Sequence, residues 1–232
     1  MNMGLLAMVW LLLKGFMVSL QLAAGVLILG TVFGFLLGIA GARGSRVTRS
    51  IIHGLVVIVR GVPLLIQVFA VFYFLPLVGP TLSPFLTATV ALSLFAAVTI
   101  GEIVRGSIVT VPAGQWEAAR ALGLGRLHTL VLVVLPEALP TIIPSLVGQF
   151  VWLIKGTSII SLLGVPELMY AGHQIIERTL RGFEVMALIW IIYTAVCYPL
   201  SVLGRYLEAR LKFPDQGSAL AAPKMALAGD RV

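Results

Sequence analysis

The sequence contains few charged residues. Of 232 residues only 11% are charged, whereas 59% are hydrophobic, and the mean hydropathy is +1.07. A soluble globular domain is typically about 45–50% apolar and about 25% charged. The composition therefore excludes an ordinary water-soluble enzyme and a disordered chain. It predicts an integral membrane protein whose surface mostly faces lipid.

Residues for metal, redox or ATP chemistry are also scarce. The single cysteine, Cys197, excludes a disulfide framework and any cysteine-based zinc or redox pair. The three histidines are too far apart in the sequence to suggest a metal site. The phosphate-binding pattern G-x-x-x-x-G-K-[ST] does not occur. We therefore expect no cofactor in this chain, no catalytic residues and no ATPase activity of its own.

Long apolar stretches dominate the chain and predict an all-α membrane domain over residues 1–213. A membrane-spanning helix needs about 20 mostly apolar residues. Proline and glycine clusters near Pro76–Pro84 and Pro136–Pro144 predict breaks between spans. Residues 214–232 are rich in Ala, Gly and Pro and are expected to form a disordered tail. The five predicted spans are 15–42, 55–77, 85–108, 140–163 and 184–205.

Two shorter features are predicted around these spans. In the first span Gly25, Gly30, Gly34, Gly38 and Gly41 recur at spacings that let a neighbouring helix approach closely, although glycine is also simply common in membrane helices. Between the last two spans, residues 168–176 are expected to form a short interfacial helix.

Basic residues predict the orientation of the chain. Five spans place the termini on opposite sides, and the cytoplasmic side of a membrane protein carries the excess of Lys and Arg. The loops after the first and third spans and the C-terminal tail hold 12 of the 16 basic residues. We therefore expect an outer amino terminus and a cytoplasmic carboxy terminus.

The cytoplasmic loop over residues 112–126 predicts a short helix. Residues 115–122 favour helix, and Gly123 and Gly125 follow them. Two turns are too short to be stable alone in water, so this helix needs a surface to dock on. Ala118, Ala119 and Leu122 form a small apolar stripe, flanked by Glu117 and Arg120. Insertion into a partner protein and packing on the membrane surface are equally compatible with the spacing.

Several segments resemble one family of transport proteins. Residues 117–119 (E-A-A), Gly123 and residues 135–136 resemble the "EAA" loop of permease subunits of ABC-type importers. Within that family, the chain is most similar to the polar amino-acid permeases of the histidine, glutamine and glutamate type. The segments that carry this resemblance are R-G-V-P-L-L-I-Q (60–67), E-I-V-R-G (102–106), G-Q-W-E-A-A-R-A-L-G (114–123) and K-G-T-S (155–158), followed by Glu167.

The resemblance implies a type I ABC importer permease fold and a set of partners. It implies a lipid bilayer, a second identical or related permease, two cytoplasmic ABC ATPase subunits that bind ATP and Mg²⁺, and an extracytoplasmic amino-acid-binding protein. It implies no nucleic acid. The location implied is the bacterial cytoplasmic (inner) membrane.

The resemblance also implies roles for individual residues. The ATPase-coupling positions are Gly114, Gln115, Trp116, Glu117, Ala118, Ala119, Arg120, Leu122 and Gly123. The positions expected along the substrate path or at a gate are Gln67, Thr99, Glu102, Lys155, Thr157, Ser158 and Glu167. From their chemistry alone, Glu102 and Arg105 could instead pair with each other, and Thr157 and Ser158 could bond to their own helix.

Two departures from the family pattern bear on the cargo. Gly156 stands where Asp is usual, and Thr99 stands where Tyr is common. The expected substrate is a polar amino acid, with an opine or another small polar solute as an alternative. Two hypotheses come from other functional classes: an ion-coupled carrier or channel, and a membrane scaffold that recruits a cytoplasmic partner. No internal repeat typical of carriers is evident in the sequence.

Overall fold

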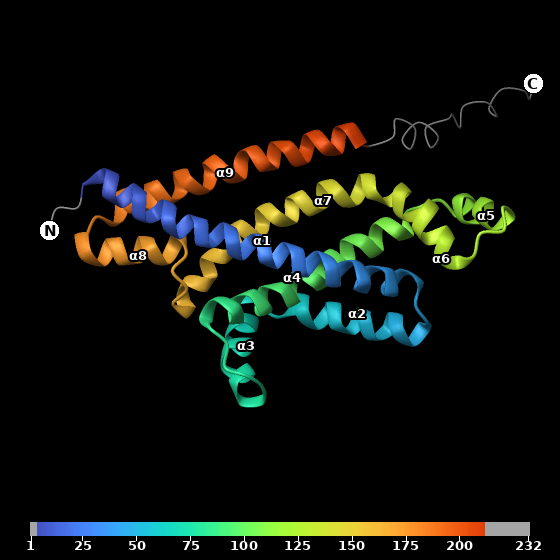
Figure 1. Cartoon of the computed structure of the whole chain (residues 1–232), viewed down its shortest axis with the longest axis horizontal. Coiled ribbons are helices and arrows are strands. Elements are labelled where there is room, and N and C mark those ends of the chain that lie inside the picture. Colours follow the sequence, from blue (N-terminus) through green and yellow to red (C-terminus); the bar gives the residue numbers. More distant parts are fainter. Residues whose placement is uncertain (1–3, 212–232) are drawn as a thin grey trace, which may run out of the picture.

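The computed structural model describes residues 4–211, and every regular element in that range is helical. Four long helices run along one axis (Figure 1): α1 (Leu5–Arg43), α4 (Pro84–Val109), α7 (Leu135–Gly156) and α9 (Gly182–Leu211). Four helical stretches in this range are apolar and long enough to cross a membrane, and a bent helix pair would make a fifth. The all-α membrane fold predicted from the sequence is confirmed. The predicted tail, residues 214–232, lies outside the described residues.

Small residues hold α1 against α4. Ideal Cβ atoms added to Gly30, Gly34 and Gly38 would lie 2.6–2.7 Å from side-chain atoms of α4, closer than real Cβ atoms approach. The prediction of close helix approach is therefore confirmed for these three glycines. It is wrong for Gly25, where an added Cβ would meet only Thr89, at 3.9 Å.

The second predicted span, 55–77, is not one helix. It is divided into α2 (Arg46–Gly61) and α3 (Leu64–Val78), which are bent by 103° relative to each other. Pro63 lacks a backbone N–H and disfavours helical geometry at the residue before it. Val62 is accordingly extended, with φ −98° and ψ 132°. As a result α3 projects away from the long axis of the bundle (Figure 1).

The break predicted near Pro76–Pro84 lies between α3 and α4. Pro76 lies inside α3, which ends at Val78. Ser83 then caps α4 by accepting a hydrogen bond from the Leu86 N–H, and Pro84 occupies the first turn, where its missing N–H costs nothing. The observed Pro84–Val109 helix covers the residues of the predicted span at 85–108 and is long and apolar enough to cross a membrane.

The fourth span begins earlier than the predicted 140–163. One continuous helical stretch covers 126–163, through α6 (Arg126–Thr129), a π-helical turn η1 (Leu130–Val134), α7 and a 3₁₀ segment η2 (Thr157–Leu163). The π turn ends just before Pro136, and such turns are where a helix can accommodate a disrupted hydrogen-bond ladder. Pro140 and Pro144 are therefore inside α7, not before it.

The last two predicted helices are confirmed. α8 (Leu168–Thr179) covers the predicted 168–176 and packs against α1, and α9 covers the predicted span at 184–205. Leu180, in the left-handed region with φ 57°, ends α8 before the chain turns into α9. α8 and the short helix α5 (Ala113–Ala121) lie at opposite ends of the bundle (Figure 1).

Candidate functional site

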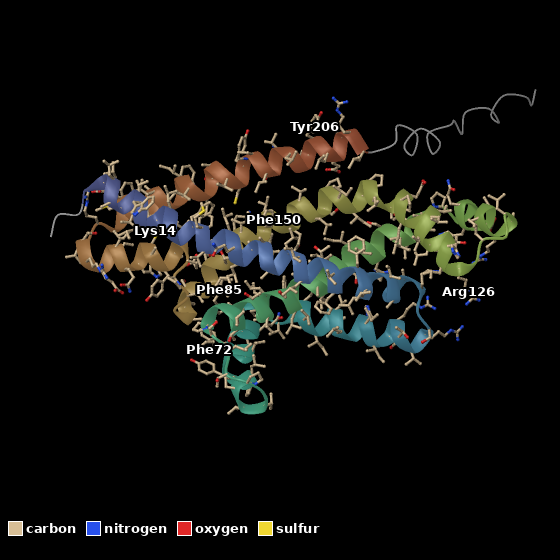
Figure 2. The ribbon with its side chains drawn as sticks, in the orientation of Figure 1. Lys14, Phe72, Phe85, Arg126, Phe150 and Tyr206 are labelled. Carbon is tan, nitrogen blue, oxygen red and sulfur yellow. The ribbon has the colours of Figure 1, made fainter. Side chains whose placement is uncertain are left out.

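The helix α5 occupies the loop between α4 and α6, where a docking helix was predicted. It begins after Pro112 and ends at Ala121, so the predicted range of 115–122 is correct to within two residues. Gly114, Gln115, Glu117 and Arg120 on this helix are all exposed. The helix is thus presented at one end of the molecule, with Arg126 just beyond it (Figure 2).

Gly123 ends this helix in a way that requires glycine. Its φ of +77° lies in the left-handed region. The Gly123 N–H donates to the Arg120 carbonyl (2.9 Å), and the Leu124 N–H donates to the Ala119 carbonyl (3.1 Å). These two bonds form a Schellman motif, which satisfies carbonyls that the last turn would otherwise leave unpaired. An Ala at this position would pay about 1–2 kcal/mol for the left-handed conformation.

The apolar stripe predicted on α5 is divided between two faces. Ala119 is only 3% exposed, because it faces the chain's own bundle. Trp116 is half-buried on the same side, with the Arg43 guanidinium 4.0 Å from its ring centroid. Ala118 is exposed, and Leu122 is 81% exposed. The expectation of one stripe was therefore wrong. Trp116 attaches the helix to the end of α1 through Arg43, α5 packs on η1 and α6, and Leu122 is left open to a partner.

Glu102 and Arg105 form an ion pair on α4. The Arg105 guanidinium donates to Glu102 Oε1, one turn away on the same helix. The pairing considered from the sequence is therefore confirmed. Both side chains line a cavity of about 210 Å³ that also includes Arg49 and His53 of α2.

Gln67 stabilises the break between α2 and α3. Its Nε2 donates to the carbonyl of Val59 (2.6 Å), in the last turn of α2, and to that of Val62 (2.7 Å), the C-cap residue that follows this helix. A helix end leaves its last carbonyls without intrahelical partners, and Gln67 supplies donors to two of them.

Thr99 bonds back to its own helix. Its hydroxyl donates to the Phe95 carbonyl within α4 (3.0 Å).

Lys155 lies on a groove of about 490 Å³ between α7 and α9. The side chain is exposed in the isolated chain, and Trp152, one turn earlier, stacks on Phe95 of α4 with ring centroids 5.1 Å apart. Glu208 is the one acidic side chain among the described residues that line the groove. A cation inside a membrane span usually faces a cavity or a partner, and Lys155 follows that rule.

The hydroxyls next to Lys155 are already used within the chain. Thr157 is fully buried and donates to the Ile154 carbonyl (2.8 Å), and Ser158 donates to the Lys155 carbonyl (2.8 Å). The structure therefore shows the alternative considered from the sequence, in which the Thr157 and Ser158 hydroxyls bond back to their own helix. Each hydroxyl oxygen keeps acceptor capacity.

Glu167 is a buried carboxylate, although it lies outside the spans. Its side chain is 0% exposed and caps α8 by accepting from the Tyr170 N–H (2.8 Å). Ser19 of α1 donates to it (3.2 Å) and accepts from the Leu168 N–H (3.2 Å). Burial raises the pKa of the Glu167 carboxyl above its ordinary value, against the opposing effect of backbone N–H bonds at Met169 and Tyr170.

The predicted substrate-path residues do not meet in one cavity of the isolated chain. Lys155, Thr157 and Ser158 lie within four residues of one another at the α7–η2 junction. Gln67 and Glu102 line other cavities, between α1, α2 and α4, and Glu167 lies at the start of α8. Ser19 and Arg43 were not predicted, yet they anchor α8 and α5. A serine in an otherwise apolar span is a sequence signal for Ser19, because polar groups inside spans usually have a partner.

The chain is similar in sequence to known transport proteins. Residues 30–213 match the family described as "Binding-protein-dependent transport system inner membrane component". The L-cystine transport system permease protein TcyB of Bacillus subtilis is 39% identical over 189 residues, covering 79% of this chain and 81% of that protein. The glutamine transport system permease protein GlnP of Escherichia coli K12 is 33% identical over 204 residues, covering 87% and 93%.

A solved structure shares the fold. The crystal structure of an amino acid ABC transporter with histidines superimposes with a TM-score of 0.80 at 27% identity, covering 90% of this chain and 100% of the other. The helices described above are therefore arranged as in a transporter of known structure.

Proposed function

Because the chain belongs to the family of binding-protein-dependent inner-membrane transport components, we propose that it is the permease subunit of an ATP-driven importer of a polar amino acid. The observation that carries this proposal is the family match over residues 30–213 together with the exposed helix α5 at one end of the bundle. The chain itself supplies the membrane path and no catalytic group. ATP and Mg²⁺ are bound by a partner ATPase.

The exposed face of α5 is the proposed ATPase contact. Leu122 presents an apolar side chain, and Glu117 and Gln115 present polar groups beside it. Trp116 and Ala119 hold the opposite face to the bundle, so movement of α5 by the ATPase would be transmitted to the end of α1 through Arg43 and to η1 at the start of the fourth span. Two copies of the permease, or this chain and a related one, would each receive one ATPase subunit. Closure of the ATPase pair would then switch access between the two sides by rigid-body motion.

The groove beside Lys155 is the proposed substrate contact. An amino acid carries a carboxylate, which the Lys155 ammonium can bind, and the half-buried Ser158 hydroxyl can accept from its ammonium. Thr157 is fully buried, so its proposed role is to support this junction from inside the bundle. Gly156 adds no carboxylate beside Lys155. This favours an amino acid with an uncharged polar side chain, in line with the glutamine and cystine named for the relatives. Gln67, Thr99 and Glu102 do not line this groove, and their bonds to Val59 and Val62, to Phe95 and to Arg105 give them structural roles in the proposal.

The proposed orientation places α5 in the cytoplasm and α8 outside. Glu167 and α8 then lie at the end where an amino-acid-binding protein delivers its cargo. Because Glu167 is buried, its proposed role at this end is to fix the start of α8, which would present the contact surface.

Co-purification from native membranes in mild detergent tests the proposal. We expect an ATP-binding subunit to accompany the wild-type chain in stoichiometric amount, and Gly123→Val to lose it, since a β-branched residue is strained at φ +77°. Gly125→Val is the matched control, because Gly125 has φ −67° and nothing within 4 Å of an added Cβ. A chain that purifies alone and moves solute without ATP would instead be a carrier or channel.

Uptake into proteoliposomes tests the cargo separately. With the complete transporter and ATP, labelled glutamine should accumulate, and Lys155→Gln should raise the KM about tenfold or more. Accumulation of a dicarboxylic or cationic amino acid in preference to glutamine would contradict the assigned substrate class but leave the importer assignment intact.

A further inference from the structure

A second cavity system lies on the face formed by α1, α2 and α4, away from the groove beside Lys155. Its largest part is an apolar cavity of about 540 Å³, with Leu29 and Phe33 of α1, Leu55 of α2 and Leu94 of α4 among its walls. Gln67 also lines it, but the Gln67 amide is already bonded to Val59 and Val62. Ser93 lines it too, and its hydroxyl has no hydrogen-bond partner among the described residues, so the lining is hydrocarbon apart from this hydroxyl.

This cavity leads to a polar one. A narrow neck of about 10 Å³ shares Leu37, Leu55 and Val98 with the apolar cavity. The same neck shares Ile52, Glu102 and Arg105 with the 210 Å³ cavity described above. The three spaces thus follow one another along the helices, from an apolar end to a polar end.

The polar end is basic. Arg49, His53 and Arg105 line it, and Glu102, the one carboxylate among its described lining residues, is already paired with Arg105. Arg49 and His53 are exposed and project from α2, which runs beside α1 at the same end of the bundle as α5 (Figure 1). The Arg49 guanidinium has no partner among residues 4–211 and lies beside an ion pair with spare donors, a setting that binds a phosphate group.

The length of the system matches half a bilayer. From Val90, in the apolar cavity, to Arg105, at the basic end, α4 advances 15 residues, or about 22 Å at 1.5 Å per residue. A bilayer including its headgroups is about 40–45 Å thick, so one leaflet spans roughly 20–22 Å. A single phospholipid has this length, with an apolar chain and a charged group at its opposite ends.

We infer that this face holds an anionic phospholipid. Its phosphate lies against Arg49, His53 and Arg105, and an acyl chain lies over Ile52 and Leu55 into the apolar cavity. Basic pockets between transmembrane helices are known to select anionic headgroups. The bound lipid would fill the angle between α2 and the rest of the bundle and so hold α2 in its position beside α4.

Native mass spectrometry of the full-length chain, purified with the subunits that accompany it, tests this inference. The complex is exchanged into detergent containing phosphatidylglycerol or phosphatidylcholine with the same acyl chains, and the retained lipids are counted. We expect phosphatidylglycerol to be retained in preference to phosphatidylcholine. Arg49→Gln should weaken phosphatidylglycerol retention about fivefold, the effect of one basic residue near a headgroup, and leave phosphatidylcholine unchanged. Arg46→Gln, on the same helix but outside the cavity, should behave as wild type.

A second substitution tests the apolar end. Leu94→Trp fills the cavity and should reduce retention of both lipids, whereas Leu86→Trp, exposed on the same helix but outside the cavity, should not. Equal retention of the two lipids by the wild type, or wild-type retention by both Arg49→Gln and Leu94→Trp, would overturn the inference. So would cross-linking of Leu94→Cys between two copies of the chain, since a second protein would then cover this face.

Discussion

Glu167 shows how one residue can join three elements. Its carboxylate caps α8, accepts from Ser19 of α1 and is fully buried. Glu167→Ala would remove the cap and leave Ser19 without this partner. We expect a loss of about 1–3 kcal/mol in the free energy of unfolding, measured by thermal denaturation in detergent. Glu177→Gln, at an exposed position of α8, is the control and should leave the stability unchanged.

The pH dependence of Glu167 has a definite sign. Burial raises its pKa in the folded state, so between the unfolded pKa near 4.5 and the raised value the folded chain binds more protons than the unfolded one. Its contribution to stability is therefore largest below pH 4.5 and falls as the pH rises through the raised pKa. Glu167→Gln keeps the capping oxygen and should flatten this part of the stability profile. An unchanged profile would mean that Glu167 ionises freely in the folded protein.

At the scale of the element, the α1–α4 contact depends on the absence of side chains. Gly34→Ala places a Cβ 2.7 Å from Ile100 and 3.0 Å from the Ala97 carbonyl oxygen. Overpacking of this kind costs typically about 1–3 kcal/mol, so the melting temperature should fall. Gly25→Ala, on the same helix with its nearest neighbour at 3.9 Å, should not lower it. Equal melting temperatures for the two variants would show that α1 and α4 can separate without cost.

The bend between α2 and α3 depends on Gln67. Gln67→Met keeps the length of the side chain but leaves the Val59 and Val62 carbonyls without their donors. We expect a loss of about 1–3 kcal/mol in stability, again by thermal denaturation. Gln174→Met on α8 provides the comparison. If Gln67→Met instead abolished transport with no change in melting temperature, its main role would be in the substrate path.

At the scale of the whole molecule, α5 and α8 should face opposite sides of the membrane. A membrane-impermeant maleimide should label Leu180→Cys in intact cells and Gly125→Cys, just beyond α5, only after the cells are opened. Both positions are exposed, and Gly125 lies outside the residues proposed to contact the ATPase. A Cys197→Ala background removes the native thiol. The reverse labelling pattern would invert the orientation predicted from the basic residues.

Much of the candidate site could be predicted locally. The helix α5 follows from a run of helix formers ended by Gly123, and the Glu102–Arg105 pair follows from a spacing of three on one helix. The division of α5 into a buried and an exposed face could not be predicted. Which side faces inward depends on Arg43, at the end of α1, reaching the ring of Trp116.

The sequence by itself determined that this is a helical membrane protein, where most of its helices lie and which family it resembles. Apolar length, proline chemistry and short motifs act over neighbouring residues. Only the tertiary structure decided that the second span is bent by 103°, that Glu167 is buried against Ser19 and that α1, α2 and α4 enclose a cavity with a basic end. Each of these depends on side chains that are distant in the chain or on the angle at which helices meet, and helix packing sets both.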